Sequence, residues 1–415
     1  MKFLYRLFFW GLPIILQGFG LIFPRVNRFL AARKNLFLRL KEFRSRYSGK
    51  LAWFHVASLG EYEQAKPVIE ALKKQNSEIG ILVSFFSPSG YEPALKKPHP
   101  LVDFVTYLPL DKRSWAQEFV QLVNPSLAFF VKYDLWYHHL EALRKFGVPH
   151  YLISASFRPN QPYFRWYGGF FKSMLESFNW IFTQNQPSLD LLNTIAVTHA
   201  SRSGDTRFDR VWATAKHAKS FPEITHWING RPTVVVGSAW QEDMDLILPL
   251  IEAHLDYVWI IAPHDLSPEP MDRWAKQLSV KSVTYSKWTP ESRASILFID
   301  NIGMLSSLYQ FAKIAYVGGG FGKGLHNILE PLGFGIPVIF GKVKNVSKFP
   351  ESIQSQHQGC GFEVNSPEDL LNVFDRLEQE VNYQKATFAA QEWVSANVGA
   401  ADRVMQKVQE LTQLS

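Results

Sequence analysis

The chain has 415 residues, of which 47% are hydrophobic and 20% charged, and this balance excludes an intrinsically disordered protein. The length exceeds what one compact core usually holds, so we expect two domains with additions. The formal net charge of +7 favours anionic partners, which are nucleic acid, phosphorylated substrates or a membrane surface. The single cysteine, Cys360, excludes an internal disulfide and a cysteine-based metal cluster.

An apolar segment over residues 7–23 opens the chain. At roughly 17 residues it lies at the lower limit for a helix that spans a membrane. Lys2 and Arg6 precede the segment, but no small-residue cleavage site follows it, so we expect an uncleaved anchor or interfacial helix and no signal peptide. The alternative is an apolar helix that packs on the body of the protein.

A basic arm follows this segment and contains one acidic residue, Glu42. Positive charge beside an apolar segment is typical of the cytoplasmic face and attracts anionic headgroups. Nucleic-acid binding is disfavoured, because no recognition motif accompanies this local charge. We therefore assign residues 1–48 to a membrane anchor with a basic juxtamembrane arm. Its basic residues are Arg25, Arg28, Arg33, Lys34, Arg39, Lys41, Arg44 and Arg46.

Two halves with alternating strands and helices follow the arm. Short apolar runs bounded by turn residues predict buried parallel strands, and helical stripes between them predict two doubly wound sheets. We expect a first domain over residues 49–213, a linker over 214–232 and a second domain over 233–415. The expected strands are Leu51–Ala57, Ile79–Phe86, Val102–Leu108, Ser126–Val131, His150–Ser154 and Trp180–Thr183, then Thr233–Gly237, Tyr257–Ala262, Val280–Tyr285, Ile296–Ile299, Ile314–Val317 and Pro337–Phe340.

The first chemical motif lies where the first strand ends, in residues 55–63. Gly60 permits a tight turn, which places Glu61 at the start of the next helix. A carboxylate there is favoured in its ionised form and can act as a general base toward an attacking hydroxyl. Glu61 could equally be a residue that only complements the helix dipole. Glu63 is a rival, although it points elsewhere on the helix.

The second motif is the glycine cluster Gly318–Gly320 and the residues up to Pro331. Glycines let the backbone approach a ligand, and the N–H groups at a helix start face anions. If the helix begins at Leu325, then His326, Asn327 and Glu330 share one face, and Glu330 can accept the hydroxyls of a ribose. This predicts a nucleotide-sugar site. The alternative is a glycine-rich turn with a capping glutamate.

These two motifs, with five further segments, resemble the 3-deoxy-D-manno-octulosonic acid (Kdo) transferases of glycosyltransferase family 30. The resemblance runs nearly end to end. It implies two Rossmann-like domains that face each other across a cleft (the GT-B type), with the apolar anchor helix at the N-terminus. It also implies transfer of Kdo from CMP-Kdo to a lipid A precursor. The five segments are Lys132–Trp136, Gly204–Asp209, Val236–Ser238 with Glu242, Ile261–His264 and Asp300–Leu305.

The resemblance also assigns roles to single residues. Glu61 matches the catalytic base. Lys132 matches a lysine that could hold acceptor phosphate or donor carboxylate, although a solvated lysine is the alternative, and Ser238 matches a loop near the donor phosphate or is an ordinary helix cap. The nucleotide contacts are expected at Pro263, His264, Gly319, Gly320, His326, Asn327 and Glu330, and the interdomain hinge at Arg207 and Asp209.

The chain departs from the family at His264, where many members have arginine, so this nucleotide contact differs in charge. No Asp-x-Asp motif or cluster at ligand spacing predicts a metal, and no cofactor is expected. The expected partners are CMP-Kdo, the lipid acceptor and the anionic inner-membrane surface, at its cytoplasmic face. The alternatives are a transferase of the same fold that uses a UDP-hexosamine, a nucleotide-sugar epimerase, and a non-catalytic sensor of nucleotide sugars.

Overall fold

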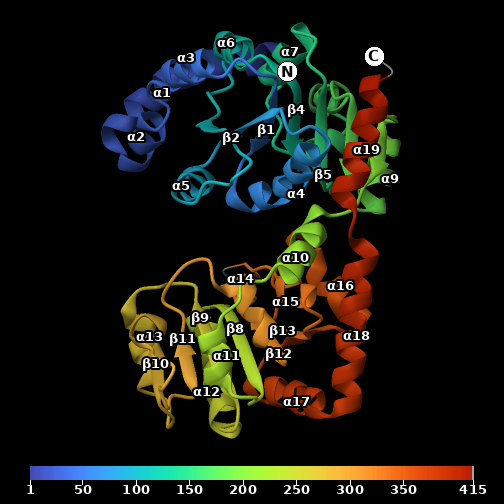
Figure 1. Cartoon of the computed structure of the whole chain (residues 1–415). Helices are drawn as coiled ribbons and strands as arrows, with labels where there is room; N and C mark the ends of the chain where they lie inside the picture. Colours follow the sequence, from blue (N-terminus) through green and yellow to red (C-terminus); the bar gives the residue numbers. More distant parts are fainter. Residues whose placement is uncertain (323, 414–415) are drawn as a thin grey trace. The chain divides into compact units, whose positions relative to one another are not determined.

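The computed structural model describes residues 1–322 and 324–413, so Lys323 of the glycine-rich segment lies outside the described residues, as does the side chain of Arg25. Contacts divide the chain into two compact units (Figure 1). Unit 1 runs from Met1 to Arg210 and takes up the chain again from Gly399, and unit 2 runs from Val211 to Val398. Each unit holds one seven-stranded parallel sheet, which confirms the expected pair of doubly wound sheets.

The sheet of unit 1 has the order β3-β2-β1-β4-β5-β6-β7. Its central strands are buried on both faces, as the continuous apolar runs predict. The strands are β1 (Leu51–Val56), β2 (Gly80–Phe85), β3 (Phe104–Tyr107), β4 (Pro125–Val131), β5 (His150–Ala155), β6 (Trp180–Thr183) and β7 (Ala200–Arg202).

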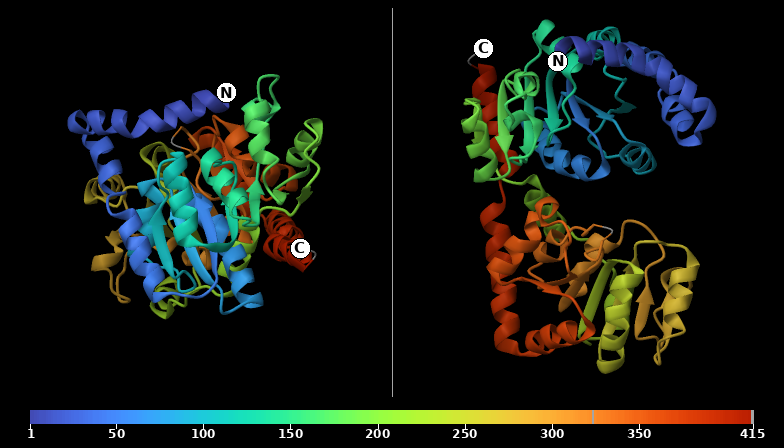
Figure 2. Two further views of the ribbon diagram at one scale, coloured as in Figure 1. Left: turned by 90° about the horizontal axis from the view of Figure 1, so that it is seen from above. Right: turned by 180° about the vertical axis from the view of Figure 1, so that it is seen from behind.

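Helices connect these strands, and three more form an arm before β1. In Figure 2 the arm is the dark blue arch that leaves the body of unit 1. The arm helices are α1 (Lys2–Ile22), α2 (Pro24–Ala31) and α3 (Leu36–Arg46). The others are α4 (Leu59–Gln75), α5 (Pro88–Lys96), α6 (Arg113–Val123), α7 (Tyr137–Lys145), η1 (Pro162–Phe164), α8 (Gly169–Leu175), α9 (Gln186–Thr194) and α10 (Thr206–Lys216).

The sheet of unit 2 has the order β10-β11-β9-β8-β12-β13-β14. Its strands are β8 (Thr233–Ala239), β9 (Val258–Pro263), β10 (Ser282–Thr284), β11 (Ile296–Phe298), β12 (Ile314–Val317), β13 (Val338–Gly341) and β14 (Gly361–Val364). Its helices are α11 (Pro222–Ile228), α12 (Gln241–Ala253), α13 (Pro268–Ala275), η2 (Tyr285–Lys287), α14 (Leu305–Leu308), η3 (Tyr309–Phe311), α15 (Leu329–Gly333), η4 (Val346–Lys348), α16 (Pro350–Gln358), α17 (Pro367–Glu378) and α18 (Glu380–Asn397).

The last helix, α19 (Ala400–Gln413), belongs to unit 1, where it packs against α4. The sequence placed residues 233–415 in one domain and 214–232 in a linker. In the structure the chain enters unit 2 after Arg210 and returns at Gly399, and α11 lies inside the expected linker. Asp209 accepts hydrogen bonds from the backbone N–H groups of Gly399 (2.5 Å) and Ala401 (2.9 Å), so one carboxylate holds both crossing points together.

Arg33 fixes the arm to the sheet of unit 1. Its guanidinium donates to the carbonyl oxygens of Leu108 (3.0 Å) and Phe86 (2.6 Å), which follow the carboxyl ends of β3 and β2. The same group lies 3.7 Å from the centre of the Phe29 ring and 4.7 Å from that of Tyr107. Burial lowers the pKa of Arg33 to about 10. The arm is therefore attached at the edge of the sheet where the strand-to-helix loops begin.

Candidate functional site

Glu61 lies at the topological switch point of unit 1. The sheet order reverses between β1 and β4, and ligands of doubly wound sheets bind at the carboxyl ends of the strands beside such a reversal. Glu61 follows β1 in the first turn of α4, as the sequence predicted, and Lys132 and Asp134 follow β4. The structure thus brings Glu61 and the Lys132–Trp136 segment to one edge of one sheet.

The Glu61 residue is 8% exposed, and its carboxylate accepts a hydrogen bond from the backbone N–H of Ala57 at 2.5 Å. Burial raises the pKa of Glu61 above its ordinary value, and the charge of Asp134 adds to this rise. The Ala57 N–H group, Lys132 and His55 act on the pKa in the opposite direction. A carboxyl group with a raised pKa is a stronger proton acceptor once it is ionised. Glu63, the rival residue, instead pairs with Lys66 and Arg210.

A network of buried, hydrogen-bonded side chains lies beside Glu61 at the carboxyl edge of the sheet of unit 1. The sequence did not predict this network. His55 is fully buried, with Nδ1 2.9 Å from Ser84 Oγ and Nε2 2.9 Å from Asp134 Oδ2. The indole N–H of Trp53 donates to the same Ser84 hydroxyl (2.8 Å), and that of Trp136 donates to Asp134 (3.2 Å). If the Ser84 hydroxyl donates its hydrogen bond to Nδ1, then the N–H of the neutral ring is on Nε2 and donates to Asp134. These hydrogen bonds fix the orientation of Asp134, and the charge of Asp134 raises the pKa of Glu61.

The second candidate site lies at the switch point of unit 2, between β8 and β12. Asp243 organises both loops there, because its carboxylate accepts from the N–H groups of Trp240 (2.9 Å) and Gly319 (3.0 Å) and from the Tyr316 hydroxyl (3.0 Å). Burial raises the pKa of Asp243, whereas these three donors act in the opposite direction. Asp243 was absent from the candidate residues, since nothing in the sequence shows that α12 reaches the glycine cluster.

Packing within the protein already requires glycine at two positions of this site, whether or not a ligand binds. A Cβ on Gly320 would lie 2.0 Å from the carbonyl oxygen of Gly341, and one on Gly318 would lie 2.4 Å from that of Ser238. Gly319 has φ of 93°, in the region that favours glycine. Ser238 also has positive φ, 54°, where the pairing of β8 with β9 shifts register. The two loops are therefore held close together, and Ser238 adopts a backbone conformation that is uncommon for a residue other than glycine.

The helix after the glycine cluster begins later than predicted. Residues Gly324–Asn327 form a loop, and α15 begins only at Leu329. The reason is local, because the Gly324 N–H donates to Gly319 (2.9 Å) and the His326 N–H to Gly318 (3.2 Å), which folds the loop back over the cluster. The predicted common helical face of His326, Asn327 and Glu330 is therefore wrong.

Two of these three side chains still meet. The Asn327 side-chain amide donates to Glu330 Oε1 at 3.3 Å, and its oxygen accepts from the Leu329 N–H. Asn327 thus positions the Glu330 carboxylate from outside the helix.

An aromatic cluster completes this edge of unit 2. The His264 ring, directly after Pro263, stacks on Trp240 with centroids 4.1 Å apart and an interplanar angle of 22°, and it lies 4.8 Å from the His326 ring. Burial lowers the pKa of His264. Burial, with the nearby His264, lowers the pKa of His326 to about 4, so both rings are neutral near pH 7. His264 therefore contributes a neutral aromatic surface to this edge.

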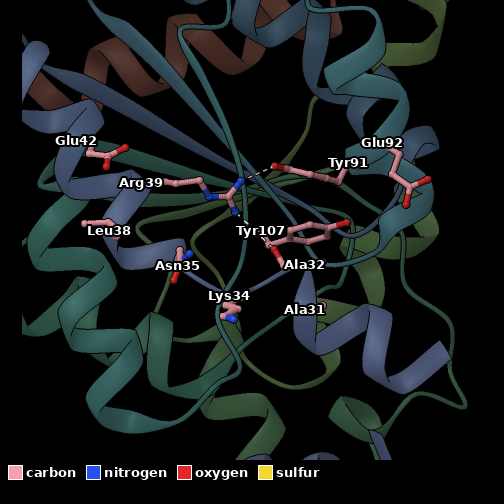
Figure 3. A pocket seen from close by; sticks show the side chains of 10 residues that line it. All are labelled: Ala31, Ala32, Lys34, Asn35, Leu38, Arg39, Glu42, Tyr91, Glu92 and Tyr107. Carbon is pink, nitrogen blue, oxygen red and sulfur yellow. Dashed lines mark hydrogen bonds between the residues drawn. The ribbon is translucent and has the colours of Figure 1, made fainter. Parts of the chain in front are cut away.

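A separate cavity of about 560 Å³ lies at the base of the arm in unit 1. In Figure 3, Arg39 reaches from α3 toward Tyr91, with Glu42 and Glu92 at opposite ends. Arg39 donates to the Tyr91 hydroxyl at 3.1 Å. Neither Glu61 nor Lys132 lines this cavity. Among the described residues, no group of three or more His, Cys, Asp or Glu side chains is arranged to hold a metal ion.

Comparison with known proteins connects this geometry to a family. A family model described as 3-Deoxy-D-manno-octulosonic-acid transferase (kdotransferase) matches residues 32–210, which include the Glu61 edge. The chain is 26% identical to the 3-deoxy-D-manno-octulosonic acid transferase of Chlamydophila psittaci over 81% of this chain and 80% of that protein. It is also 26% identical to the enzyme of the same name from Aquifex aeolicus, over 78% and 85%.

Solved structures share the fold at low sequence identity. The UDP-GlcNAc 2-epimerase of Neisseria meningitidis matches with a TM-score of 0.63 and 18% identity, over 87% of this chain and 99% of that one. A glycosyltransferase from Rickettsia africae matches with a TM-score of 0.54 and 14% identity, over 89% and 100%. At these identities the likeness concerns the fold alone, and it agrees with the predicted two-domain α/β architecture.

Proposed function

Because the chain is related to the Kdo transferases, we propose that it is an inverting glycosyltransferase that moves Kdo from CMP-Kdo to the 6′-hydroxyl of a lipid A precursor in lipopolysaccharide biosynthesis. The observation that carries the proposal is the position of Glu61. A buried carboxylate with a raised pKa lies at the switch point of a sheet within the residues that the family model matches.

In the proposed reaction, the acceptor oxygen attacks the anomeric carbon of Kdo and forms the new glycosidic bond. Glu61 takes the hydroxyl proton during this step, in the role of a general base. The bond between the anomeric carbon and the phosphate oxygen of CMP breaks, and its electron pair leaves with CMP. Lys132, with a positive charge near Glu61, is suited to an anionic group of either substrate.

Unit 2 is proposed to hold the cytidylate. Glu330, positioned by Asn327, would accept the ribose hydroxyls, and the loops around Ser238 and Gly319, which Asp243 joins, would lie against the phosphate. The backbone of both loops is fixed before the ligand arrives, because the Asp243 carboxylate accepts from the N–H groups of Trp240 and Gly319. The arm would bring the protein to a membrane surface, where the hydroxyl of a lipid acceptor lies. We propose that this surface is the cytoplasmic face of the inner membrane.

The test uses purified full-length protein with CMP-Kdo and a tetraacylated lipid A precursor, and mass spectrometry of the product. Glu61→Gln and Glu61→Ala are expected to reduce turnover by roughly 10²- to 10⁴-fold, with binding of CMP retained. Glu63→Gln is the matched control on the same helix and is expected to stay near native activity. Near-native turnover in both Glu61 variants would remove Glu61 from the mechanism.

The alternatives give different results in the same samples. A transferase that uses a UDP-hexosamine would be stabilised against heat by uridine nucleotides and not by cytidine nucleotides. An epimerase would convert a nucleotide sugar with no lipid acceptor present. A product lipid heavier by one or more Kdo residues supports the proposed function over both, and absence of any turnover would favour a sensor.

A further inference from the structure

Helix α1 contacts the rest of unit 1 along a single stripe. Tyr5, Phe9, Pro13 and Gly20 lie on one face of the helix, and Phe9 and Pro13 are buried. The helix is long and apolar enough to cross a membrane by length and composition, and 17% of its apolar window is buried inside the protein. The number of α1 residues that the protein body holds decides whether enough helix remains to cross a membrane.

The N-terminal half of α1 is built into the protein body. The Tyr5 hydroxyl donates to Asp111 Oδ2 at 2.6 Å, and Asp111 is fully buried. This carboxylate also accepts from the backbone N–H groups of His138 (2.9 Å) and His139 (3.0 Å) at the start of α7. One turn later, the Phe9 ring lies against Trp136 with centroids 6.1 Å apart. The views in Figures 1 and 2 agree that α1 begins beside the body and extends outward to α2.

The geometry leaves too little helix to cross a bilayer. Only Trp10–Ile22 extend beyond Phe9, and about 13 residues at 1.5 Å each reach roughly 20 Å, whereas the hydrocarbon core is about 30 Å thick. Releasing the first nine residues would leave Asp111 without its Tyr5 donor. It would also break the ring contacts of Tyr5 with Tyr137 and Phe170.

The opposite faces of α1 are apolar and exposed. Large side chains there are half or more exposed, including Phe3 (75%), Trp10 (63%), Ile14 (64%) and Leu21 (90%). The first 41 residues contain eight basic residues and no acidic one, and of these eight the sheet holds Arg33 and Tyr91 holds Arg39. An apolar face bordered by basic groups matches the headgroup boundary of an anionic leaflet, where each nearby basic residue contributes about 1 kcal/mol.

We propose that α1 and α2 lie in the plane of an anionic phospholipid leaflet and bind it from one side, as a monotopic anchor. The occupant of the exposed face is the bilayer surface, and the Tyr5–Asp111 contact sets the angle at which unit 1 meets it. This inference deepens the proposed membrane location and depends on it. The depth and sidedness of the helix are measured without enzyme turnover. A result against the in-plane anchor can therefore be told apart from a result against Kdo transfer.

The experiment places single cysteines on the exposed face and labels them with the fluorophore NBD. Phe3→Cys, Ile14→Cys and Leu21→Cys are made in a Cys360→Ala background, and the full chain is added to preformed vesicles of phosphatidylethanolamine and phosphatidylglycerol. Lipids with quenchers at shallow and deep acyl positions report depth, and dithionite added outside reports sidedness. Vesicles of phosphatidylcholine are the charge control.

The in-plane anchor predicts similar shallow depths at all three positions and bleaching of the Phe3→Cys label by outside dithionite. It also predicts roughly tenfold or stronger binding to the anionic vesicles than to phosphatidylcholine. A spanning helix would give a deep label at Ile14→Cys and protect the Phe3→Cys label, which overturns the proposal. Labels that stay unquenched by lipid while the protein dimerises would assign the face to a second copy and also overturn it.

A second variant tests the positioning role of Tyr5. Tyr5→Phe keeps the ring but removes the donor to Asp111, and it is expected to speed hydrogen exchange in α1 while α4 stays protected. Binding of the phosphate-bearing nucleotide CMP should be unchanged, because unit 2 is untouched. If hydrogen exchange in α1 matches the native protein, Tyr5 does not set the angle of the anchor.

Discussion

Replacing His326 with glutamine is expected to make the protein less sensitive to acid. Burial, together with the nearby His264, lowers the pKa of His326 from 6.5 to about 4. The unfolded chain therefore takes up a proton at this residue below about pH 6.5, whereas the folded chain resists it until about pH 4. Above about pH 6.5, His326 therefore costs no stability. As the pH falls from about 6.5 toward about 4, the free energy of unfolding decreases, because only the unfolded chain binds the proton.

The size of the effect can be worked from this pKa. Between about pH 6.5 and about pH 5, one excluded proton costs at most about 2 kcal/mol, since one pH unit corresponds to about 1.4 kcal/mol. The His326 ring is only partly buried, and solvent screening reduces the cost, so we expect about 1 kcal/mol.

The assay is urea unfolding of the native chain, His326→Gln and His357→Gln at about pH 7.5 and about pH 5. His357 is exposed on α16 of the same unit and provides the matched control. The native chain and the control are expected to lose about 1 kcal/mol more than His326→Gln between the two pH values. An equal loss in all three proteins would show that the surroundings of His326 do not keep its ring neutral.

Three further outcomes are expected. Because burial raises the pKa of Glu61, initial rates of Kdo transfer should fall as the pH drops through a value above 4.5, and a rate that stays flat there would contradict a role as base. Asp243→Ala removes the acceptor of three hydrogen bonds and should cost about 3 kcal/mol in urea unfolding and weaken CMP binding by calorimetry, and unchanged affinity would show that the loops hold without it. Gly320→Ala should cost about 2 kcal/mol or more in thermal unfolding, since its Cβ would lie 2.0 Å from the Gly341 oxygen, and a native melting temperature would mean that the backbone yields cheaply.

The sheets could be predicted because their strands are continuous apolar runs, such as Leu51–Val56 and Ile314–Val317. The sequence missed β7 and β14, which have three and four residues and contain charged or half-buried positions, so their composition resembles that of loops. Strands this short form because a neighbouring strand offers its edge, and that edge is not visible in a single sequence window.

The candidate sites divide in the same way. Glu61 could be placed from a glycine and a strand end, which are local signals. Asp243 and the His55–Asp134 pair could not, because their partners lie 76 and 79 residues away in the sequence. The late start of α15 has a similar cause, since the hydrogen bond from His326 back to Gly318 competes with helix formation at Leu325.

The return of α19 to unit 1 has a consequence for biosynthesis. Gly399 and Asp209 are separated by 190 residues, and the ribosome makes all of unit 2 between them. Until α19 emerges, the surface of α4 that it covers stays open to water, on the helix that carries Glu61. Domains usually complete their folding in the order of their synthesis. Unit 1 therefore begins first but is completed only after unit 2, once α19 has been made and can pack against the helix that carries Glu61.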